Sequence, residues 1–293
     1  MTAVQTLSIV TPSYLPDLEL CRDLQTSVLN FTAPDVDQFI IVPAADRTHF
    51  ADLAGARTKI RDVGDFLPRS MVKVPAMNMW VNARRPFPPV RGWVAQQIVK
   101  LAAAAAMPTD VVLLLDSDVL LIRSLTAASF APNGVLQLFE LPDGVDATLP
   151  RHRVWHHAAR RMLGLPPLTA GLLPDYICWP CAWSPAIVRD MLARVESVTG
   201  LRWQTAVGRE LHFSEMILYG VYVREVLGAE SPVDTTARMR CVNHSDEIPL
   251  DEQSLRSMLD AVSPEDLAIM VSAKSGTDLT TRRSVLNAFQ APA

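Results

Sequence analysis

Five consecutive apolar residues at positions 111–115 lead directly into Asp116-Ser117-Asp118, and a second apolar run follows at positions 119–122. A short apolar run that includes β-branched residues predicts a buried strand of a parallel sheet. Two carboxylates at the end of such a strand repel each other and lose hydration, so they need a positive partner. A divalent cation with oxygen ligands meets that need. Open α/β sheets also bind their ligands beyond the carboxyl ends of their strands.

Strands and helices alternate along the first part of the chain. Apolar runs predict strands over residues 7–10 and 39–42, and we expect a third strand over residues 59–63. Helical periodicity predicts a helix capped by Asp17 and a short helix over residues 46–54. This β-α-β-α-β order indicates an α/β protein with a mostly parallel central sheet flanked by helices. No linker is long enough to divide the chain, so we expect one large domain.

The segment before the aspartates combines a predicted loop with a predicted helix. Residues 84–91 are rich in proline and arginine, which is typical of a loop. Residues 92–106 have the composition and periodicity of a strong helix. Trp93, Gln97 and Lys100 are spaced by four and three positions, so they fall on one face of that helix.

After residue 123 the pattern is less regular. We expect strands over residues 135–139, 177–183 and 267–271, a helix that begins at Ser184-Pro185, and a helix over residues 213–227 with Ser214 as its cap. Between them, residues 142–174 form a long excursion that contains a basic helical segment at residues 151–161.

Composition excludes several classes of protein. A chain of 293 residues that is 49% apolar and 20% charged has ample material for a globular core. The formal net charge of −4 argues against nucleic acid as a partner. The sequence contains neither a run of eighteen apolar residues nor a basic segment at its start, so we expect no transmembrane segment and no signal peptide. Four cysteines do not suggest a disulfide scaffold, and a cytoplasmic, bacterial-type enzyme is the default expectation.

The pattern resembles the nucleotide-sugar-dependent glycosyltransferases with the GT-A fold, in a bacterial branch. The likeness covers most of residues 7–245 and rests on the first strand and its turn, the helix that carries Gln97 and Lys100, the D-x-D element at residues 116–118, and the segment at residues 214–220. It implies a Rossmann-like GT-A domain. Residues 1–125 would then be the nucleotide-binding half, residues 126–250 the acceptor-binding half, and residues 251–293 a C-terminal extension.

The same resemblance implies a metal site. In that family the acidic pair holds Mn²⁺ or Mg²⁺, which bridges the two phosphates of the sugar donor. Asp118 would be a direct ligand, and Asp116 would lie nearer the ribose or a coordinated water. Two aspartates cannot fill the coordination shell of a hard divalent ion, and the family often adds a histidine near the end of the core. His244 is in the matching place and is the candidate third ligand.

The substrates follow from the family in the same way. The donor would be a nucleoside diphosphate sugar, and the acceptor would be a hydroxyl group. UDP is favoured as the nucleotide because it is the usual one in the family. Residues that would line the donor site are Thr11, Pro12, Ser13, Tyr14, Gln97, Lys100 and Ser117. An inverting enzyme needs a base that deprotonates the acceptor, and Glu215 is the first candidate, followed by Asp175.

Two other functions remain open at this point. Residues 113–119 also match the nucleophile strand of phosphatases of the HAD class, in which Asp116 would accept the phosphoryl group. That motif normally opens its domain, whereas about 110 residues of strand and helix units precede it here. The third possibility is a protein that binds nucleotide sugars or glycans without catalysis.

For three further groups of residues, the sequence leaves more than one role possible. Cys178, Cys181, Cys241 and His244 have the residue types of a structural zinc site, although the gap of about sixty residues between the two pairs is long. The basic segment at residues 151–161 would dock an anionic acceptor or be a solvated helix face. Residues 272–276 would close over the diphosphate or be a terminal loop.

Overall fold

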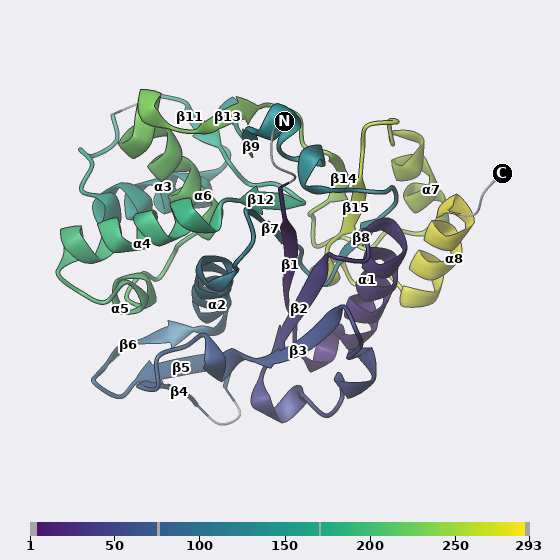
Figure 1. Ribbon diagram of the computed structural model, residues 1–293, viewed down its shortest axis with the longest axis horizontal. Helices are drawn as coiled ribbons and strands as arrows, with labels where there is room; N and C mark the ends of the chain where they lie inside the picture. The colour runs from purple at the N-terminus through teal and green to yellow at the C-terminus, as the bar shows by residue number, and fades with distance from the viewer. Residues whose placement is uncertain (1–4, 75–76, 170, 291–293) are drawn as a thin grey trace.

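The central sheet contains five strands in the order β12, β7, β1, β2 and β3 in the computed structural model (Figure 1). The structure describes residues 5–74, 77–169 and 171–290. The strands are β1 (Leu7–Pro12), β2 (Asp37–Val42), β3 (Thr58–Asp62), β4 (Met71–Lys73), β5 (Met79–Asn82), β6 (Arg85–Arg91), β7 (Val111–Leu114), β8 (Val119–Leu121), β9 (Leu136–Phe139), β10 (Leu141–Val145), β11 (Leu173–Asp175), β12 (Cys181–Trp183), β13 (Val233–Thr236), β14 (Cys241–His244) and β15 (Ala268–Val271). The helices are α1 (Leu18–Phe31), α2 (Gly92–Ala106), α3 (Pro150–Leu163), α4 (Pro185–Thr199), α5 (Trp203–Gly208), α6 (Glu215–Val221), α7 (Glu252–Asp260) and α8 (Leu279–Gln290).

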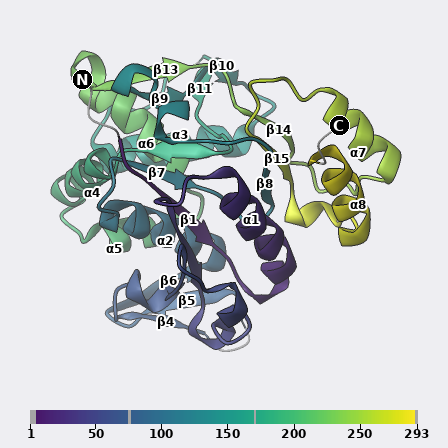
Figure 2. The same ribbon diagram turned by 45° about the vertical axis from the view of Figure 1, so that its right-hand side comes forward.

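The expectation of an α/β protein is confirmed, and the central sheet is mixed. Strands β7, β1, β2 and β3 run parallel, whereas β12 runs antiparallel to β7. The chain steps outward from β1 to β3 and then returns across β1 to form β7. Because such crossovers are right-handed, the outward helix α1 and the returning helix α2 lie on opposite faces of the sheet (Figures 1 and 2). Strand β7 therefore lies between β1 and β12, with its carboxyl end between the two halves of the chain.

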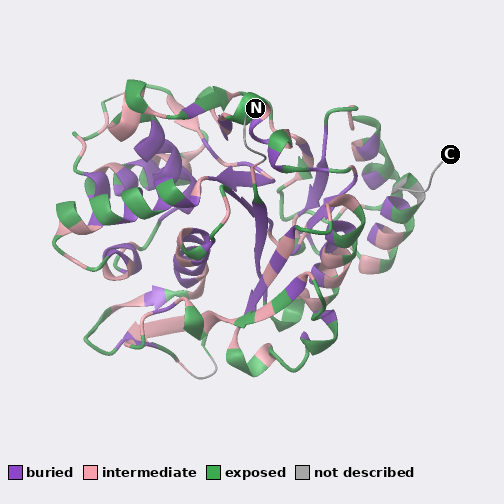
Figure 3. Cartoon of the chain, viewed as in Figure 1, coloured by how far each residue is buried: buried purple, intermediate pink, exposed green. Residues whose placement is uncertain are grey.

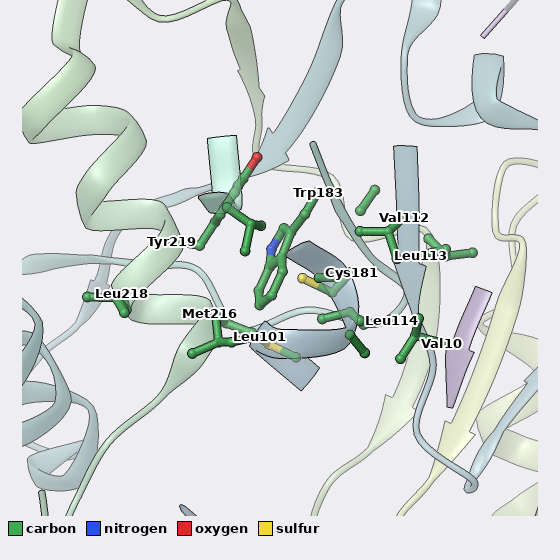
Figure 4. Close-up of a cluster of buried hydrophobic side chains, with 14 of the residues drawn as sticks. Val10, Leu101, Val112, Leu113, Leu114, Cys181, Trp183, Met216, Leu218 and Tyr219 are labelled. Carbon is green, nitrogen blue, oxygen red and sulfur yellow. The ribbon is translucent and has the colours of Figure 1, made fainter. Parts of the chain in front are cut away.

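The main core packs around β7 (Figure 4). Strands β1, β7 and β12 are buried and the edge strand β3 is partly exposed, while many other exposed residues lie on the outer faces of the surrounding helices (Figure 3). Trp183 of β12 stacks on Tyr219 of α6 with ring centroids 4.9 Å apart. The hydroxyl of Tyr219 accepts a hydrogen bond from the Ser184 N–H, so this buried phenol is satisfied. These contacts fix α6 against β12, whose Trp183 pairs with Val112 of β7.

A second sheet extends the molecule beside the aspartates. It has the order β14, β15, β8, with β15 parallel to β14 and antiparallel to β8. Helices α7 and α8 pack on it through a separate apolar cluster of Leu120, Ile122, Leu255, Leu259, Ile269, Val271, Val285 and Leu286. The segment 251–293, set apart in the sequence as an extension, thus supplies the middle strand of this sheet.

The prediction of a loop at residues 84–91 is wrong. These residues form β6, the edge strand of an antiparallel sheet in the order β4, β5, β6. The prolines suggested a loop because proline cannot donate to a strand ladder, but an edge strand tolerates that loss. Strands β4 and β5 were not expected from the sequence either.

Other expected elements are shorter in the structure. Residues 46–54 do not form the expected helix. They include the 3₁₀ turn Ala51–Leu53 and the last residue of the 3₁₀ turn Ala44–Asp46. The strand expected over residues 177–183 is reduced to β12, because Pro180 directly precedes it. The helix expected over residues 213–227 is α6, followed by a π-helical turn at Tyr222–Leu227. Ser214 caps α6 as expected, since its hydroxyl accepts the Ile217 N–H.

Within the described ranges, every helix is too short or too polar to cross a membrane.

Candidate functional site

Asp116, Ser117 and Asp118 lie in the turn between β7 and β8, just after the carboxyl end of β7. The Val119 N–H donates to the Asp116 carbonyl at 3.1 Å and closes this turn. The chain leaves the central sheet here and enters the second sheet, so the two carboxylates lie at the junction of both sheets. This is the position at which open α/β sheets bind ligands.

Lys100 of α2 forms a buried ion pair with two carboxylates. Its Nζ lies 2.8 Å from Asp116 Oδ1 and 3.2 Å from Glu215 Oε1. The side chains of Lys100 and Glu215 are 7% and 6% exposed, whereas that of Asp116 is 28% exposed. Burial alone would lower the pKa of Lys100, but the charges of Asp116 and Glu215 outweigh it and raise that pKa. Lys100 is therefore a fixed positive charge, already committed to protein carboxylates.

Gln97 links the same helix to α6. Its Oε1 accepts the backbone N–H of Glu215 at 3.0 Å, one of the N–H groups that a helix start leaves open. Its Nε2 is buried and has no hydrogen-bond partner among the described residues. The predicted common face of Gln97 and Lys100 is thus confirmed, and both side chains meet Glu215.

Asp118 is held by the C-terminal segment. Its Oδ2 accepts the Ala273 N–H at 2.9 Å, and its carbonyl oxygen accepts a hydrogen bond from Arg282 of α8 at 2.5 Å. Burial, and after it the charge of Asp116, raise the pKa of Asp118. Residues 272–276 therefore lie against the second aspartate and bond to its carboxylate.

Asp17 is a functional candidate that the sequence did not reveal. The sequence assigned it to capping α1, but its side chain makes no capping hydrogen bond. Burial and then the charges of Asp118 and Asp116 raise its pKa to about 6. Three carboxylates from α1 and the β7–β8 turn thus share one negative region, and only the fold brings Asp17 there.

Residues at the end of β1 and just after it lie beside the aspartate turn. Thr11 and Pro12 belong to the strand itself, and the Thr11 hydroxyl accepts a hydrogen bond from Gln38. Ser117 Oγ donates to Ser13 Oγ at 2.9 Å, and both residues are buried. Tyr14 is 48% exposed. Of the four donor-site residues predicted at positions 11–14, Tyr14 is the one whose side chain is open to a ligand, because the other three are buried.

His244 lies in the same row of the second sheet as Asp118. It pairs with Val271, and the Val271 N–H donates to the Asp118 carbonyl. Two strand spacings separate these backbones by about 10 Å, with side chains on a common face. The His244 Nε2, however, lies 2.7 Å from the Ile248 carbonyl oxygen. In the described part of the chain, no three histidine, cysteine or acidic side chains are close enough together to hold a metal ion.

Asp175 belongs to a different group of side chains. Its Oδ2 lies 3.2 Å from His152 Nδ1, and its Oδ1 accepts the Ile177 N–H. His152 stacks on Trp155 with centroids 4.6 Å apart. No hydrogen bond or ion pair connects Asp175 with Lys100 or its partners in the ranges that the structure describes. The structure thus separates the two candidate bases and leaves Glu215 with the aspartates.

The arginines of the basic segment at residues 151–161, which lies in α3, contact groups outside that segment as well as within it. Arg160 pairs with Glu225, Arg161 pairs with Glu210, and the Arg151 guanidinium lies over the rings of Trp93 and Trp155. Most of this charge is therefore engaged by neighbours in the fold.

The cysteines are buried free thiols. Burial, followed by a hydrogen bond with Cys178, raises the pKa of Cys181 well above its usual value. Burial also raises the pKa of Cys241. A zinc ligand must be a thiolate, so these surroundings favour the protonated, structural form.

Comparison with known protein families identifies a relationship over most of the chain. A family model described as a family of unknown function (DUF6492) matches residues 2–261. The match includes the strands and helices from β1 to α7 and ends before β15 and α8, which carry the partners of Asp118. No curated protein matches the chain.

Proposed function

The chain belongs to the family of unknown function DUF6492, and we propose that it is a metal-dependent glycosyltransferase of the GT-A type. It would move a sugar from a nucleoside diphosphate, UDP by preference, to a hydroxyl acceptor. The observation that carries the proposal is the negative region at the end of β7. Asp17, Asp116 and Asp118 share this region, where burial first and then their mutual repulsion raise the pKa values of Asp17 and Asp118.

The charge balance of this region favours a bound cation. Lys100 is shared between Asp116 and Glu215, so it cannot also neutralise Asp17 and Asp118. Carboxylate oxygens are the donors that Mn²⁺ and Mg²⁺ prefer, and the residues therefore fit such an ion chemically. Asp116 and Asp118 would hold it together with phosphate oxygens of the donor, and Asp17 and His244 would join them only if their side chains moved closer. When bound, the ion would stabilise the charge of the departing diphosphate.

Gln97 offers a donor for the substrate. A buried amide N–H without a partner costs free energy, and a phosphate or sugar oxygen beside it would remove that cost. Tyr14 is placed near the same carboxylates, because Asp17 contributes to the raised pKa of its phenol after burial does. Its exposed ring offers a face on which a nucleobase would stack.

The transfer itself breaks the bond between the anomeric carbon and the diphosphate oxygen and forms a bond to the acceptor oxygen. The electron pair leaves with the diphosphate, and the acceptor proton passes to a carboxylate in an inverting reaction. Glu215 is the better placed base, because it shares Lys100 with Asp116.

Calorimetric binding of UDP, GDP and their sugars, with and without Mn²⁺, tests the proposal. We expect the wild type to bind one nucleotide only with the metal, and chelation to reverse the binding. Asp118→Asn should abolish that binding. Asp234→Asn is the matched control, because Asp234 is exposed on β13.

Absence of nucleotide binding under every condition would refute the glycosyltransferase proposal. A phosphoryl group trapped on Asp116 after incubation with a phosphate ester would instead identify a phosphatase.

A further inference from the structure

The sheet formed by β4, β5 and β6, with the turn before it, is strongly basic. Residues 66–91, which we call the basic sheet, contain five basic and no acidic side chains, although the whole chain has a net charge of −4. The five are exposed: Arg69, Lys73, Arg84, Arg85 and Arg91. Positive charge is therefore concentrated on one small element of an acidic protein.

Most of these cations have no partner among the residues that the structure describes. Within the described residues, the side chains of Arg69, Lys73, Arg84 and Arg85 make no ion pair and no hydrogen bond. Arg91 donates to the Leu211 carbonyl. Arginines elsewhere are commonly engaged, as Arg283 is by Glu19 and Asp23. The free charges are available to an external anion.

Apolar side chains accompany the free charges. Phe87 is 86% exposed, and Val72 and Met77 are 56% and 50% exposed. Phe87 follows Arg84 and Arg85 closely in the β5–β6 hairpin. The basic sheet lies at the lower edge of the molecule in both ribbon views, and its surface is largely exposed (Figures 1, 2 and 3). An exposed aromatic ring beside unpaired arginines is the pattern of a surface that enters a lipid interface.

We propose that the basic sheet docks the protein on an anionic phospholipid membrane. The cations would contact lipid phosphates, and Phe87 would enter the headgroup region. This occupant is favoured over a protein strand because the free edge strand β6 contains Pro86, Pro88 and Pro89, which cannot donate to an added strand. It is favoured over nucleic acid because exposed Val72 and Met77 match acyl chains better than phosphates.

Docking would also orient the candidate site. Strand β6 continues directly into α2, which carries Gln97 and Lys100. A membrane-bound basic sheet would therefore hold the aspartates at a fixed distance from the lipid surface. The inference stands on charge and exposure alone, so it does not depend on the proposed glycosyltransferase activity.

Co-sedimentation of the full chain with lipid vesicles tests the inference. We expect binding to vesicles of phosphatidylcholine with phosphatidylglycerol, and none to phosphatidylcholine alone. Each cation near an anionic surface is worth about a fivefold change in affinity, so Arg84→Gln with Arg85→Gln should weaken binding by about 25-fold. Phe87→Ser should weaken it by on the order of tenfold. Binding should fall as salt is raised.

A matched double variant separates a local surface from overall charge. Arg47→Gln with Arg202→Gln removes the same charge from two exposed sites outside the basic sheet, and it should leave vesicle binding unchanged. Equal losses in both double variants would overturn the proposal, as would equal binding to neutral and anionic vesicles. Tighter binding of a single-stranded oligonucleotide than of anionic vesicles at the same salt would also overturn it, and would assign the surface to nucleic acid.

Discussion

Replacing Lys100 with methionine tests the charge arrangement at the centre of the candidate site. Methionine keeps most of the volume of the lysine stem and removes only the ammonium group. Glu215, at 6% exposure, would then be a buried carboxylate without a counter-ion, whereas Asp116, at 28% exposure, would still reach water. Most of the penalty therefore arises from Glu215.

The expected cost follows from this burial. Removing one partner of a buried ion pair costs about 3–5 kcal/mol, and the partial exposure of Asp116 places the expected loss near the lower end, about 3 kcal/mol. For a chain of this size each kcal/mol lowers the melting temperature by about 2 °C, so the variant should melt about 6 °C below the wild type. Urea unfolding followed by circular dichroism measures the free energy directly.

Lys59→Met is the matched control. Lys59 pairs with Asp37, but their side chains are 47% and 35% exposed, so the same substitution should cost less than about 1 kcal/mol. Adding Glu215→Gln to Lys100→Met should recover part of the loss, since it removes the orphaned charge. Equal losses for Lys100→Met and Lys59→Met, or no recovery in the double variant, would refute the buried-pair reasoning.

Two further outcomes follow from the structure. Asp17→Asn should stabilise the metal-free protein. The folded-state pKa of Asp17, about 6, lies above the ordinary 3.8, so ionisation of Asp17 destabilises the fold as pH rises through this window. The gain in stability should reach about 1–2 kcal/mol near pH 7, after allowance for partial exposure, and should vanish below about pH 4. A pH-independent difference in urea unfolding would contradict this assignment. Gly220→Ala should destabilise the protein by about 1–3 kcal/mol, because its Cβ would lie 2.2 Å from the Tyr176 ring. Gly55→Ala, where a Cβ meets nothing within 4 Å, should change stability by less than about 0.5 kcal/mol, and equal effects at both glycines would contradict the packing argument.

The local sequence was sufficient for elements whose signals are short-range. Apolar runs predicted β1, β2 and β7, because a strand buried on both faces needs apolar residues throughout. The face of α2 that carries Gln97 and Lys100 followed from helical spacing alone. Ser214 was identified as a cap because capping acts within one turn.

Sequence-based prediction failed for elements whose secondary structure depends on the strands and helices packed against them. Residues 84–91 became an edge strand because β5 supplied a partner on one side only, where prolines are tolerated. Residues 46–54 lack a continuous helix, although their composition permits one. The antiparallel direction of β12 also depends on how the chain returns to β7, and nothing in its own three residues encodes that.

The sequence by itself determined the α/β class, the position of Asp116 and Asp118 at a strand end, and the clustering of basic residues between positions 66 and 91. Tertiary structure alone decided that Lys100 pairs with Asp116 and Glu215, that Asp17 joins the two aspartates, and that Ala273 and Arg282 hold Asp118. These partners lie from 16 to 164 positions apart in the chain. Local propensity cannot specify such contacts, because they form only when distant segments meet at one edge of the central sheet.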